Sequence, residues 1–128
     1  MSHRAAGAFE VTMRPESVGG EPGIARFALD KNYHGDLAAM SRGQMLSAGA
    51  IEKGSAAYVA LEIVEGTLGG RSGSFALQHT GTMTRGSARL TIDVVPDSGT
   101  GELEGLSGAM TISIEDGRHS YELDYSLP

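Results

Sequence analysis

The stretch ARLTIDV, residues 88–94, alternates apolar and polar side chains without a break. Its apolar residues occupy every second position, which we call one parity, and they are Ala88, Leu90, Ile92 and Val94. Because successive side chains of a β-strand point to opposite faces, this alternation predicts a strand with one buried and one exposed face. An α-helix would need apolar residues three and four positions apart, and this stretch lacks them.

The same period of two recurs along most of the chain and predicts eight strands. They lie near residues 8–14, 24–34, 36–47, 57–66, 74–80, 87–95, 100–114 and 118–127. The links are short and rich in turn residues, and Asp116-Gly117 is a strong hairpin signal because both positions tolerate positive φ. Residues 47–53 are the one place where a helical turn could form.

Short links favour an antiparallel meander in which each strand pairs with the next. Eight such strands can close into a barrel, which removes the exposed edges that a flat sheet would leave. The predicted fold class is therefore all-β, an eight-stranded antiparallel meander closed into a β-barrel. A two-sheet sandwich is the alternative, but it usually needs longer crossover connections. We expect one domain over residues 1–128, with residues 1–7 as a flexible N-terminal tail.

Composition and charge exclude several classes of function. The 128 residues include no cysteine, which rules out disulfides, thiolate zinc sites and cysteine nucleophiles and fits a reducing cytoplasm. The net charge of −6 and the lack of a basic run disfavour nucleic-acid binding. The N-terminus lacks the apolar segment of a secretory signal, and no apolar run approaches the ~20 residues needed to span a bilayer. We therefore expect a soluble, cytoplasmic protein with no nucleic-acid or membrane partner.

One ten-residue phrase occurs twice, as GTLGGRSGSF at 66–75 and as GELEGLSGAM at 101–110. A weaker third copy begins at Gly35 and keeps the leucine and the serine of the phrase. The copies begin at 35, 66 and 101, so their spacings of 31 and 35 residues each approach two strands plus two turns. This predicts one structural task that is performed at successive pairs of strands.

The repeated phrase does not fit the common catalytic motifs. A phosphate-binding loop would need a lysine and a following helix, and neither is present. Ser72 and Ser107 stand directly before a glycine, outside the Gly-any-Ser-any-Gly frame of a nucleophile elbow. We interpret the phrase as glycine that lets a strand bulge or coil sharply, with leucine fixing the register inside the barrel.

Four stretches stand in a distinctive order: AYVALE at 57–62, GTLGGRSGSFALQHTGT at 66–82, VVPDSGTGELEGLSGAM at 94–110 and HSYELDY at 119–125. Together they resemble a bacterial family catalogued as domain of unknown function 3224, over nearly the whole chain from about residue 8. The resemblance implies an allene-oxide-cyclase-like barrel, which is eight-stranded, antiparallel and calycin-like. The segment SGTGELEG at 98–105 is also similar to a glycine-bounded segment of plant allene oxide cyclases and dirigent proteins, which guide a reactive intermediate inside a barrel cavity and oligomerise. The close family has no established activity, and no cyclase catalytic residue is carried over.

Parity predicts which polar side chains reach the barrel interior. Those that share a parity with apolar neighbours are Lys31, Tyr33, His79, His119, Tyr121 and Tyr125. Histidine titrates near neutrality and tyrosine offers a donor on an apolar body, so this lining suits an apolar ligand with one or two polar atoms. The alternative for both histidines is a strand-end residue hydrogen-bonded to the backbone. A metal site from His34, His79 and His119 has no supporting pair spacing, so no metal or other cofactor is predicted.

The strand around Glu62 is apolar on both faces, so its orientation is open. If the parity of Leu61 faces the interior, Glu62 lies at an interface between subunits or on the surface, paired with Arg71. If the strand is inverted, Glu62 points into the barrel as a buried carboxylate with a raised pKa, suited to a general base or a ligand anchor. In that inward orientation, Arg71 and Gln78 are its expected polar partners.

Three functions remain open. The first is a barrel that binds a small, largely apolar ligand, with the candidate binding residues Tyr33, Glu62, Gln78, His79, His119, Tyr121 and Tyr125. The second is a cyclase- or isomerase-type enzyme that uses Glu62 or His79 as its acid or base. The third is a non-catalytic oligomer whose barrel is packed solid. We expect a homo-oligomer, either a dimer or a trimer.

Overall fold

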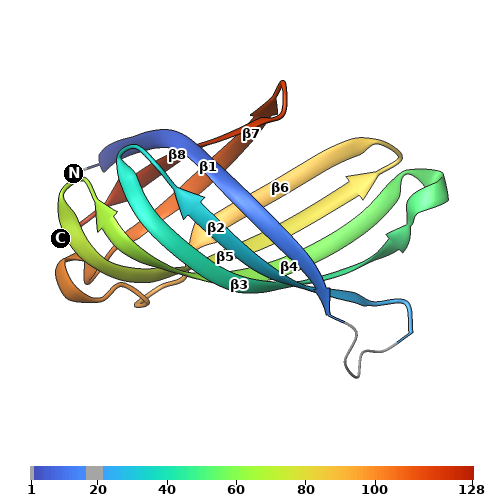
Figure 1. Cartoon of the computed structure of the whole chain (residues 1–128), viewed down its shortest axis with the longest axis horizontal. Helices are drawn as coiled ribbons and strands as arrows, with labels where there is room; N and C mark the ends of the chain where they lie inside the picture. Colours follow the sequence, from blue (N-terminus) through green and yellow to red (C-terminus); the bar gives the residue numbers. More distant parts are fainter. Residues whose placement is uncertain (1, 17–21) are drawn as a thin grey trace.

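The computed structural model describes residues 2–16 and 22–128, and in this part of the chain eight strands form a closed barrel (Figure 1). They are β1 (Ser2–Glu16), β2 (Ala25–Tyr33), β3 (Leu37–Ala50), β4 (Ser55–Leu68), β5 (Arg71–Thr84), β6 (Ser87–Val94), β7 (Ser107–Glu115) and β8 (Arg118–Ser126). Each strand pairs antiparallel with the next, and β8 pairs with β1. The predicted all-β class and the eight-stranded meander are confirmed.

Two short 3₁₀ turns, η1 (Ile51–Lys53) and η2 (Gly101–Leu103), lie between the described strands. The first falls within residues 47–53, where the sequence allows a helical turn. The second corrects the predicted strand over residues 100–114, because β7 begins only at Ser107. Gly101 and Gly105 have φ angles of 61° and 83°, a left-handed backbone that interrupts a strand. Among the described residues, no helix has the length and apolar character to cross a membrane.

Residues 2–7 form the first half of β1, whereas a flexible tail is expected from the sequence over residues 1–7, of which residue 1 lies outside the described residues. Ser2 to Gly7 pair in register with Ser126 to Tyr121 of β8. A Cβ atom on Gly7 would lie 1.9 Å from the carbonyl oxygen of His34, so the close approach of β1 to the β2–β3 turn requires a glycine there. The small side chains that permit this packing also weaken the apolar alternation, and the sequence pattern therefore missed the start of the strand.

One end of the barrel is closed by turns that bond to one another. Figure 1 shows the start of β1 and the C-terminus at this end, beside the β2–β3 and β4–β5 turns. The amide of Gly69 donates to the carbonyl oxygen of Asp36 at 2.9 Å, and the amide of Thr100 donates to that of Ser74 at 2.8 Å. All three copies of the repeat begin near this end, because two strands and two turns return the chain to it.

The glycines of the repeat let the strands approach closely at the closed end. Gly66 of β4 and Gly73 of β5 face each other in register. A Cβ atom on Gly66 would lie 2.3 Å from the carbonyl oxygen of Ala38, and one on Gly73 would lie 2.1 Å from that of Thr100. Both distances are far below a van der Waals contact, so the repeated phrase has an architectural role.

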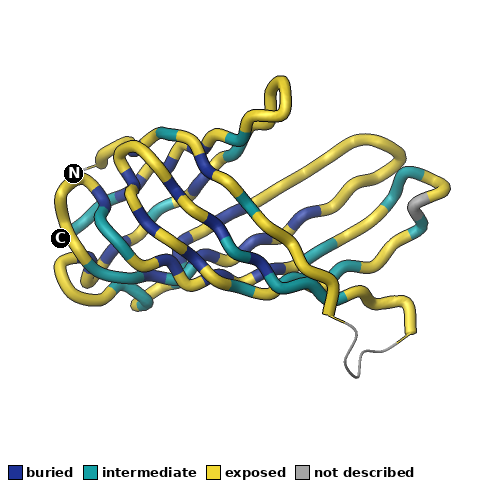
Figure 2. Tube along the Cα trace, in the orientation of Figure 1, coloured by how far each residue is buried: buried dark blue, intermediate teal, exposed yellow. Residues whose placement is uncertain are grey.

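The opposite end flares open. β6 and β7 pair in register through Ile92–Met110 and Asp93–Ala109, and beyond these pairs the β7–β8 hairpin stands away from β6 (Figure 1). Figure 2 shows buried residues gathered toward the closed end and exposed residues along the hairpins of the open end. The barrel therefore has a packed half and an open half.

β4 adopts the inverted orientation that its sequence leaves open. Glu62 and Val64 are 1% and 0% exposed, whereas Leu61 and Ile63 are 58% and 59% exposed. Glu62 therefore points into the barrel, and the expectations of a surface or interface position and of pairing with Arg71 are wrong. Alternation could not decide this orientation, because both faces of the strand are apolar.

Candidate functional site

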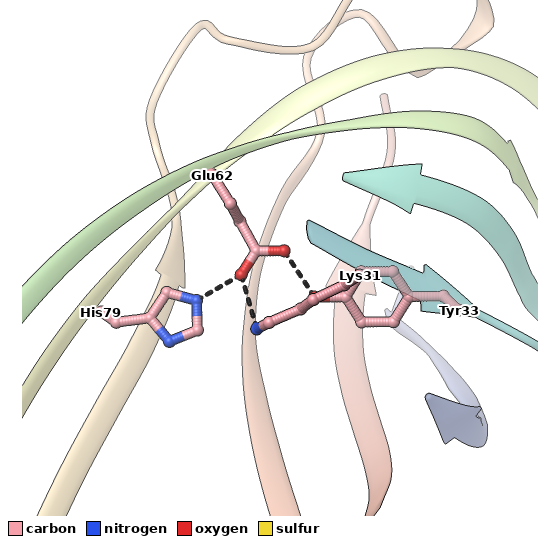
Figure 3. A network of polar contacts seen from close by, with 4 residues as sticks. All are labelled: Lys31, Tyr33, Glu62 and His79. Atoms are coloured by element: carbon pink, nitrogen blue, oxygen red, sulfur yellow. Dashed lines mark hydrogen bonds and ion pairs between the residues drawn. The ribbon is translucent and has the colours of Figure 1, made fainter. Parts of the chain in front are cut away.

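Four polar side chains from three strands meet inside the barrel (Figure 3). The carboxylate of Glu62, on β4, lies at their centre. Its Oε2 accepts hydrogen bonds from Lys31 Nζ of β2 at 2.8 Å and from His79 Nε2 of β5 at 2.6 Å. Its Oε1 accepts a hydrogen bond from the Tyr33 hydroxyl of β2 at 2.6 Å. All four residues are buried, and we call them the Glu62 cluster.

Small residues on β3 allow this cluster to form. β3 lies between β2 and β4 in the sheet, and its inward-facing residues Ala39, Ser41 and Gly43 leave the space that the longer side chains cross. Gly43 stands opposite Glu62 in register, and a Cβ atom on Gly43 would lie 2.9 Å from the Cβ of Glu62. The third copy of the repeat contains both Ser41 and Gly43, so it also serves the site.

The cluster holds Glu62 in its ionised form. Burial alone would raise the pKa of the Glu62 carboxyl, but the hydrogen bond from His79, the charge and hydrogen bond of Lys31 and the Tyr33 hydroxyl outweigh burial and hold that pKa at about 2. The raised pKa expected for a buried Glu62 is therefore wrong in direction. The pKa of the Tyr33 hydroxyl is raised, chiefly by burial and then by the negative charge of Glu62.

Two groups of the cluster keep unused hydrogen-bonding capacity. An ionised carboxylate accepts hydrogen bonds only, so His79 Nε2 carries the hydrogen in its contact with Glu62. In a neutral imidazole the lone pair then lies on Nδ1, which has no hydrogen-bond partner among the described residues. Lys31 uses one of its three N–H bonds on Glu62, and its Nζ lies 5.3 Å from the ring centre of Phe9.

A pocket opens from the barrel toward the flared end. It has a volume of about 300 Å³, and its lining includes Met45, Tyr58, Gly81, Met83 and Leu90. On β5, Gly81 is the next inward-facing position after His79, so the pocket lies on the open side of the cluster. A Cβ atom on Gly81 would lie 2.2 Å from the Tyr58 ring, which therefore lies across this position. The pKa of Tyr58 is raised by burial and by the charge of Glu62.

Four predicted ligand residues lie outside the Glu62 cluster, namely His119, Tyr121, Tyr125 and Gln78. The Tyr121 hydroxyl donates to the carbonyl oxygen of His34 at 2.8 Å and accepts from the amide of Leu37 at 2.9 Å, so it closes the β2–β3 turn. His119 packs edge-on against the Phe9 ring with centroids 5.2 Å apart. Tyr125 is 9% exposed at the closed end. Tyr121 and Tyr125 thus face the interior as predicted but belong to the packed half.

Gln78 is placed on the other side of the wall from the cluster. It is exposed on the outer face of β5, in register with Leu61 of β4. Gln78 shares the outer face with Leu61, whereas Glu62 points into the barrel, so Gln78 cannot be a partner of Glu62. Lys31 lies inside the barrel as its sequence pattern predicts, but it is not among the predicted binding residues. Its parity with Tyr33 was the available signal, and its ion pair with Glu62 makes it a central member of the site.

The structure does not bring three histidines together. His34 contacts Glu10 at the surface with an Nε2 to Oε1 distance of 3.0 Å, whereas His79 is buried beside Glu62. Across residues 2–16 and 22–128, no group of three His, Asp or Glu side chains is arranged to hold a metal ion. The chemistry that this site offers is therefore that of an ammonium, a carboxylate, an imidazole and a phenol.

The comparisons with known proteins give a family and a solved structure. The family described as a protein of unknown function, DUF3224, matches residues 5–125. A crystal structure of a protein of unknown function from the DUF3224 family of Shewanella oneidensis MR-1 is similar, with a TM-score of 0.92 and 49% sequence identity over 100% of this chain and 99% of that one. The comparison with curated proteins gives no match. Neither match concerns allene oxide cyclases or dirigent proteins, so that part of the resemblance stays a prediction. With 121 consecutive residues matched, the chain belongs to the DUF3224 family of proteins of unknown function.

Proposed function

We propose that the open half of the barrel binds a small, largely apolar molecule through one oxygen atom that accepts a hydrogen bond from Lys31. The observation that carries this proposal is the buried ammonium group of Lys31, whose one acceptor among the described residues is Glu62 Oε2 at 2.8 Å. An ammonium group has three N–H donors, and a buried donor without an acceptor is costly. A carbonyl, carboxylate or sulfonate oxygen would complete the hydrogen bonding of Lys31.

The pocket beside the cluster supports an apolar body for this ligand. Met45, Met83 and Leu90 contribute flexible or aliphatic side chains to its wall. Methionine adapts its shape to different partners, which suits a site that accepts related molecules. The volume of about 300 Å³ lies at the lower end of the range of small-molecule sites. The ligand is therefore small, with its polar atom directed toward the cluster.

Glu62 acts as a positioning residue in this proposal. Its two oxygens already accept three hydrogen bonds, from Lys31, His79 and Tyr33, so little capacity is left for a ligand. It holds the ammonium of Lys31 and the ring of His79 in fixed directions instead. Lys31 thereby keeps unused N–H donors beside the pocket, which favours a ligand that carries an acceptor.

Composition supports a small-molecule partner in the cytoplasm. The net charge of −6 disfavours nucleic acid, and the absence of cysteine fits a reducing compartment. The cytoplasmic location and the small-molecule partner are therefore proposed from the sequence.

The binding proposal is tested with the fluorescent probe anilinonaphthalene sulfonate, which joins apolar rings to a sulfonate acceptor. The chain has no tryptophan, so the fluorescence of the bound probe is easily resolved. We expect the double variant Lys31→Met/Glu62→Gln, which keeps the cluster neutral and hydrogen-bonded, to weaken binding at least about tenfold, the loss of one hydrogen bond to a charged donor. Lys53→Met, at the exposed lysine of η1, is the matched control and should bind as the wild type does. Equal affinity of the folded double variant and the wild type would refute the proposal.

A second candidate function is proton transfer, with His79 as the base. The observation that favours it is the hydrogen bond from His79 Nε2 to the ionised Glu62, which leaves the lone pair on Nδ1. Glu62 itself, with a pKa of about 2, is too weak a base at neutral pH. Lys31 would stabilise the negative charge that develops on a carbonyl oxygen when a neighbouring C–H bond loses its proton to Nδ1.

Kemp elimination of 5-nitrobenzisoxazole tests this candidate, because the reaction reports a base in an apolar pocket. His79→Gln keeps a donor toward Glu62 but has no basic nitrogen, so we expect a rate loss of about 100-fold or more. His34→Gln, at a surface histidine, is the control and should leave the rate unchanged. Equal rates for His79→Gln and the wild type would exclude His79 as the base.

A further inference from the structure

The outer face of β3 and β4 carries a patch of exposed aliphatic side chains. Val59, Leu61 and Ile63 occupy alternate positions on β4 and are 52%, 58% and 59% exposed. Met40 and Leu46 on β3 flank them and are 68% and 44% exposed. We call these five residues the β4 patch. Contiguous apolar patches of this kind on a folded chain mark interaction sites.

The fold alone does not explain this patch. The inward face of β4 supplies the core with Ala60, Val64 and Leu68, which are all buried. The outward face of a half-buried strand normally carries polar residues, as β8 does with Glu122 and Asp124. We propose that the β4 patch is a homodimer interface, in which it packs against the same patch of a second copy of this chain.

The charges around the β4 patch favour a second copy as the occupant. The chain carries a net charge of −6, so two copies repel each other over most of their surfaces. At the patch, Arg42 stands opposite Ile63, and Glu65 stands opposite Met40. Neither charge forms an ion pair with another described residue. A face with one unpaired charge of each sign can complement itself, whereas a strongly acidic or basic partner would repel one of them.

The residues on either side of Leu61 fit a two-fold arrangement. Gln44 on β3 and Gln78 on β5 both stand opposite Leu61 in register. In a dimer whose two-fold axis runs along β4, β3 of one copy faces β5 of the other, which brings Gln44 against Gln78 of the partner subunit. Each side-chain amide both donates and accepts, so the two can bond reciprocally.

The residues of the proposed interface resemble those of stable protein–protein interfaces. Stable interfaces bury about 800 Å² on each partner, with an apolar centre and a polar rim. The β4 patch forms the centre, and the rim consists of Arg42, Gln44, Glu65 and Gln78. The two sheets would pack face to face about 10 Å apart, so that the aliphatic side chains of both copies interdigitate.

The oligomeric state of the full chain tests the interface, measured by light scattering during size-exclusion chromatography over a concentration series. We expect twice the chain mass for the wild type. Leu61→Asp places a charge at the centre of the patch and should weaken dimerisation by about 100-fold or more. Ile114→Asp is the matched control, because Ile114 is 62% exposed on β7 and lies outside the patch. This variant should remain a dimer.

A second variant guards against the possibility that Leu61→Asp disrupts the fold rather than the interface. Gln78→Arg leaves the apolar patch intact and removes the reciprocal amide pair, so it should also weaken the dimer, while circular dichroism confirms a native fold. A monomeric wild type would overturn the proposal, as would a trimer, because a two-fold axis relates two copies. An oligomer that survives Leu61→Asp, or one that Ile114→Asp disrupts equally, would also overturn it.

Discussion

Breaking the buried ion pair between Lys31 and Glu62 from one side should strongly destabilise the fold. Lys31→Met removes the ammonium but keeps an unbranched side chain of similar length, so the Glu62 carboxylate stays buried with the Tyr33 and His79 donors alone. Removing one partner of a buried pair costs about 3–5 kcal/mol, because the remaining charge is uncompensated. We expect this loss in the free energy of unfolding, which totals about 5–15 kcal/mol for a typical domain.

The double variant Lys31→Met/Glu62→Gln should recover most of that loss. The glutamine carbonyl oxygen can accept from the Tyr33 hydroxyl, and its NH₂ group can donate to His79 in the other tautomer. Residue 62 then keeps its contacts with Tyr33 and His79, and no buried charge remains. We expect its free energy of unfolding to lie within about 1–2 kcal/mol of the wild type, since neutral replacement of a buried pair is often tolerated.

Urea denaturation followed by circular dichroism gives the four free energies of this double-mutant cycle. With both single variants losing about 3–5 kcal/mol, the cycle predicts a coupling energy of at least about 4 kcal/mol. Single losses below about 1 kcal/mol would refute the reasoning, because they are typical of solvent-exposed pairs. The ammonium of Lys31 would then be hydrated, and the case for an unfilled donor in the pocket would fail.

Four further predictions concern two pH ranges and two single positions. Stability should fall as the pH drops from 4.5 to about 2, because the Glu62 pKa is lowered from 4.5 to about 2 in the fold and the unfolded chain takes up the proton first. The shift corresponds to about 3 kcal/mol, and urea denaturation should show this acid loss in the wild type and not in Glu62→Gln. Stability should also begin to fall above pH 10.0, where Tyr33 ionises in the unfolded chain while its raised pKa keeps the folded hydroxyl neutral; constant stability there would contradict the buried position of Tyr33. Tyr121→Phe removes hydrogen bonds to the β2–β3 turn and should lower the free energy of unfolding by about 1–3 kcal/mol; an accompanying loss of probe affinity would instead place this hydroxyl at the ligand. Gly43→Ala puts a Cβ atom 2.1 Å from a backbone oxygen of β4 and should cost roughly 1–3 kcal/mol, so an unchanged melting temperature would argue against this close approach.

The fold could be predicted from the sequence because most of its strands are polar on one face. Alternation such as that of residues 88–94 depends on local side-chain chemistry and survives in the structure as β6. It fails where packing requires small residues. Gly7 is needed for contact with the β2–β3 turn, and the alanines around it are too small to give a clear apolar alternation. The sequence pattern therefore predicts a tail where the first half of β1 lies. The loop before β7 alternates in sequence, yet the positive φ angles of Gly101 and Gly105 interrupt the strand.

The candidate site could be predicted only in part, for a related physical reason. His79 and Tyr33 sit on strands with one apolar face, so parity places them inside the barrel. Glu62 sits on a strand with two apolar faces, and its orientation depends on contacts that are distant in sequence. The position of Gly43 opposite Glu62 could have indicated the inward direction, since a glycine beside a long polar side chain leaves it room. Using that signal requires the register between β3 and β4, which alternation alone does not give.

The position of the Glu62 cluster argues for a function more strongly than its chemistry does. A buried ion pair is weak evidence for stability, because apolar residues of similar volume often serve as well. The closed half of this barrel already has such a core, with Phe75, Leu77 and Leu123 at most 2% exposed. The cluster instead lies where that core meets the open half, next to the pocket. A charged group at this boundary loses hydration without gaining a full set of protein partners, and Lys31 has a single acceptor among residues 2–16 and 22–128. Such an arrangement is expected where another molecule supplies the missing hydrogen bond.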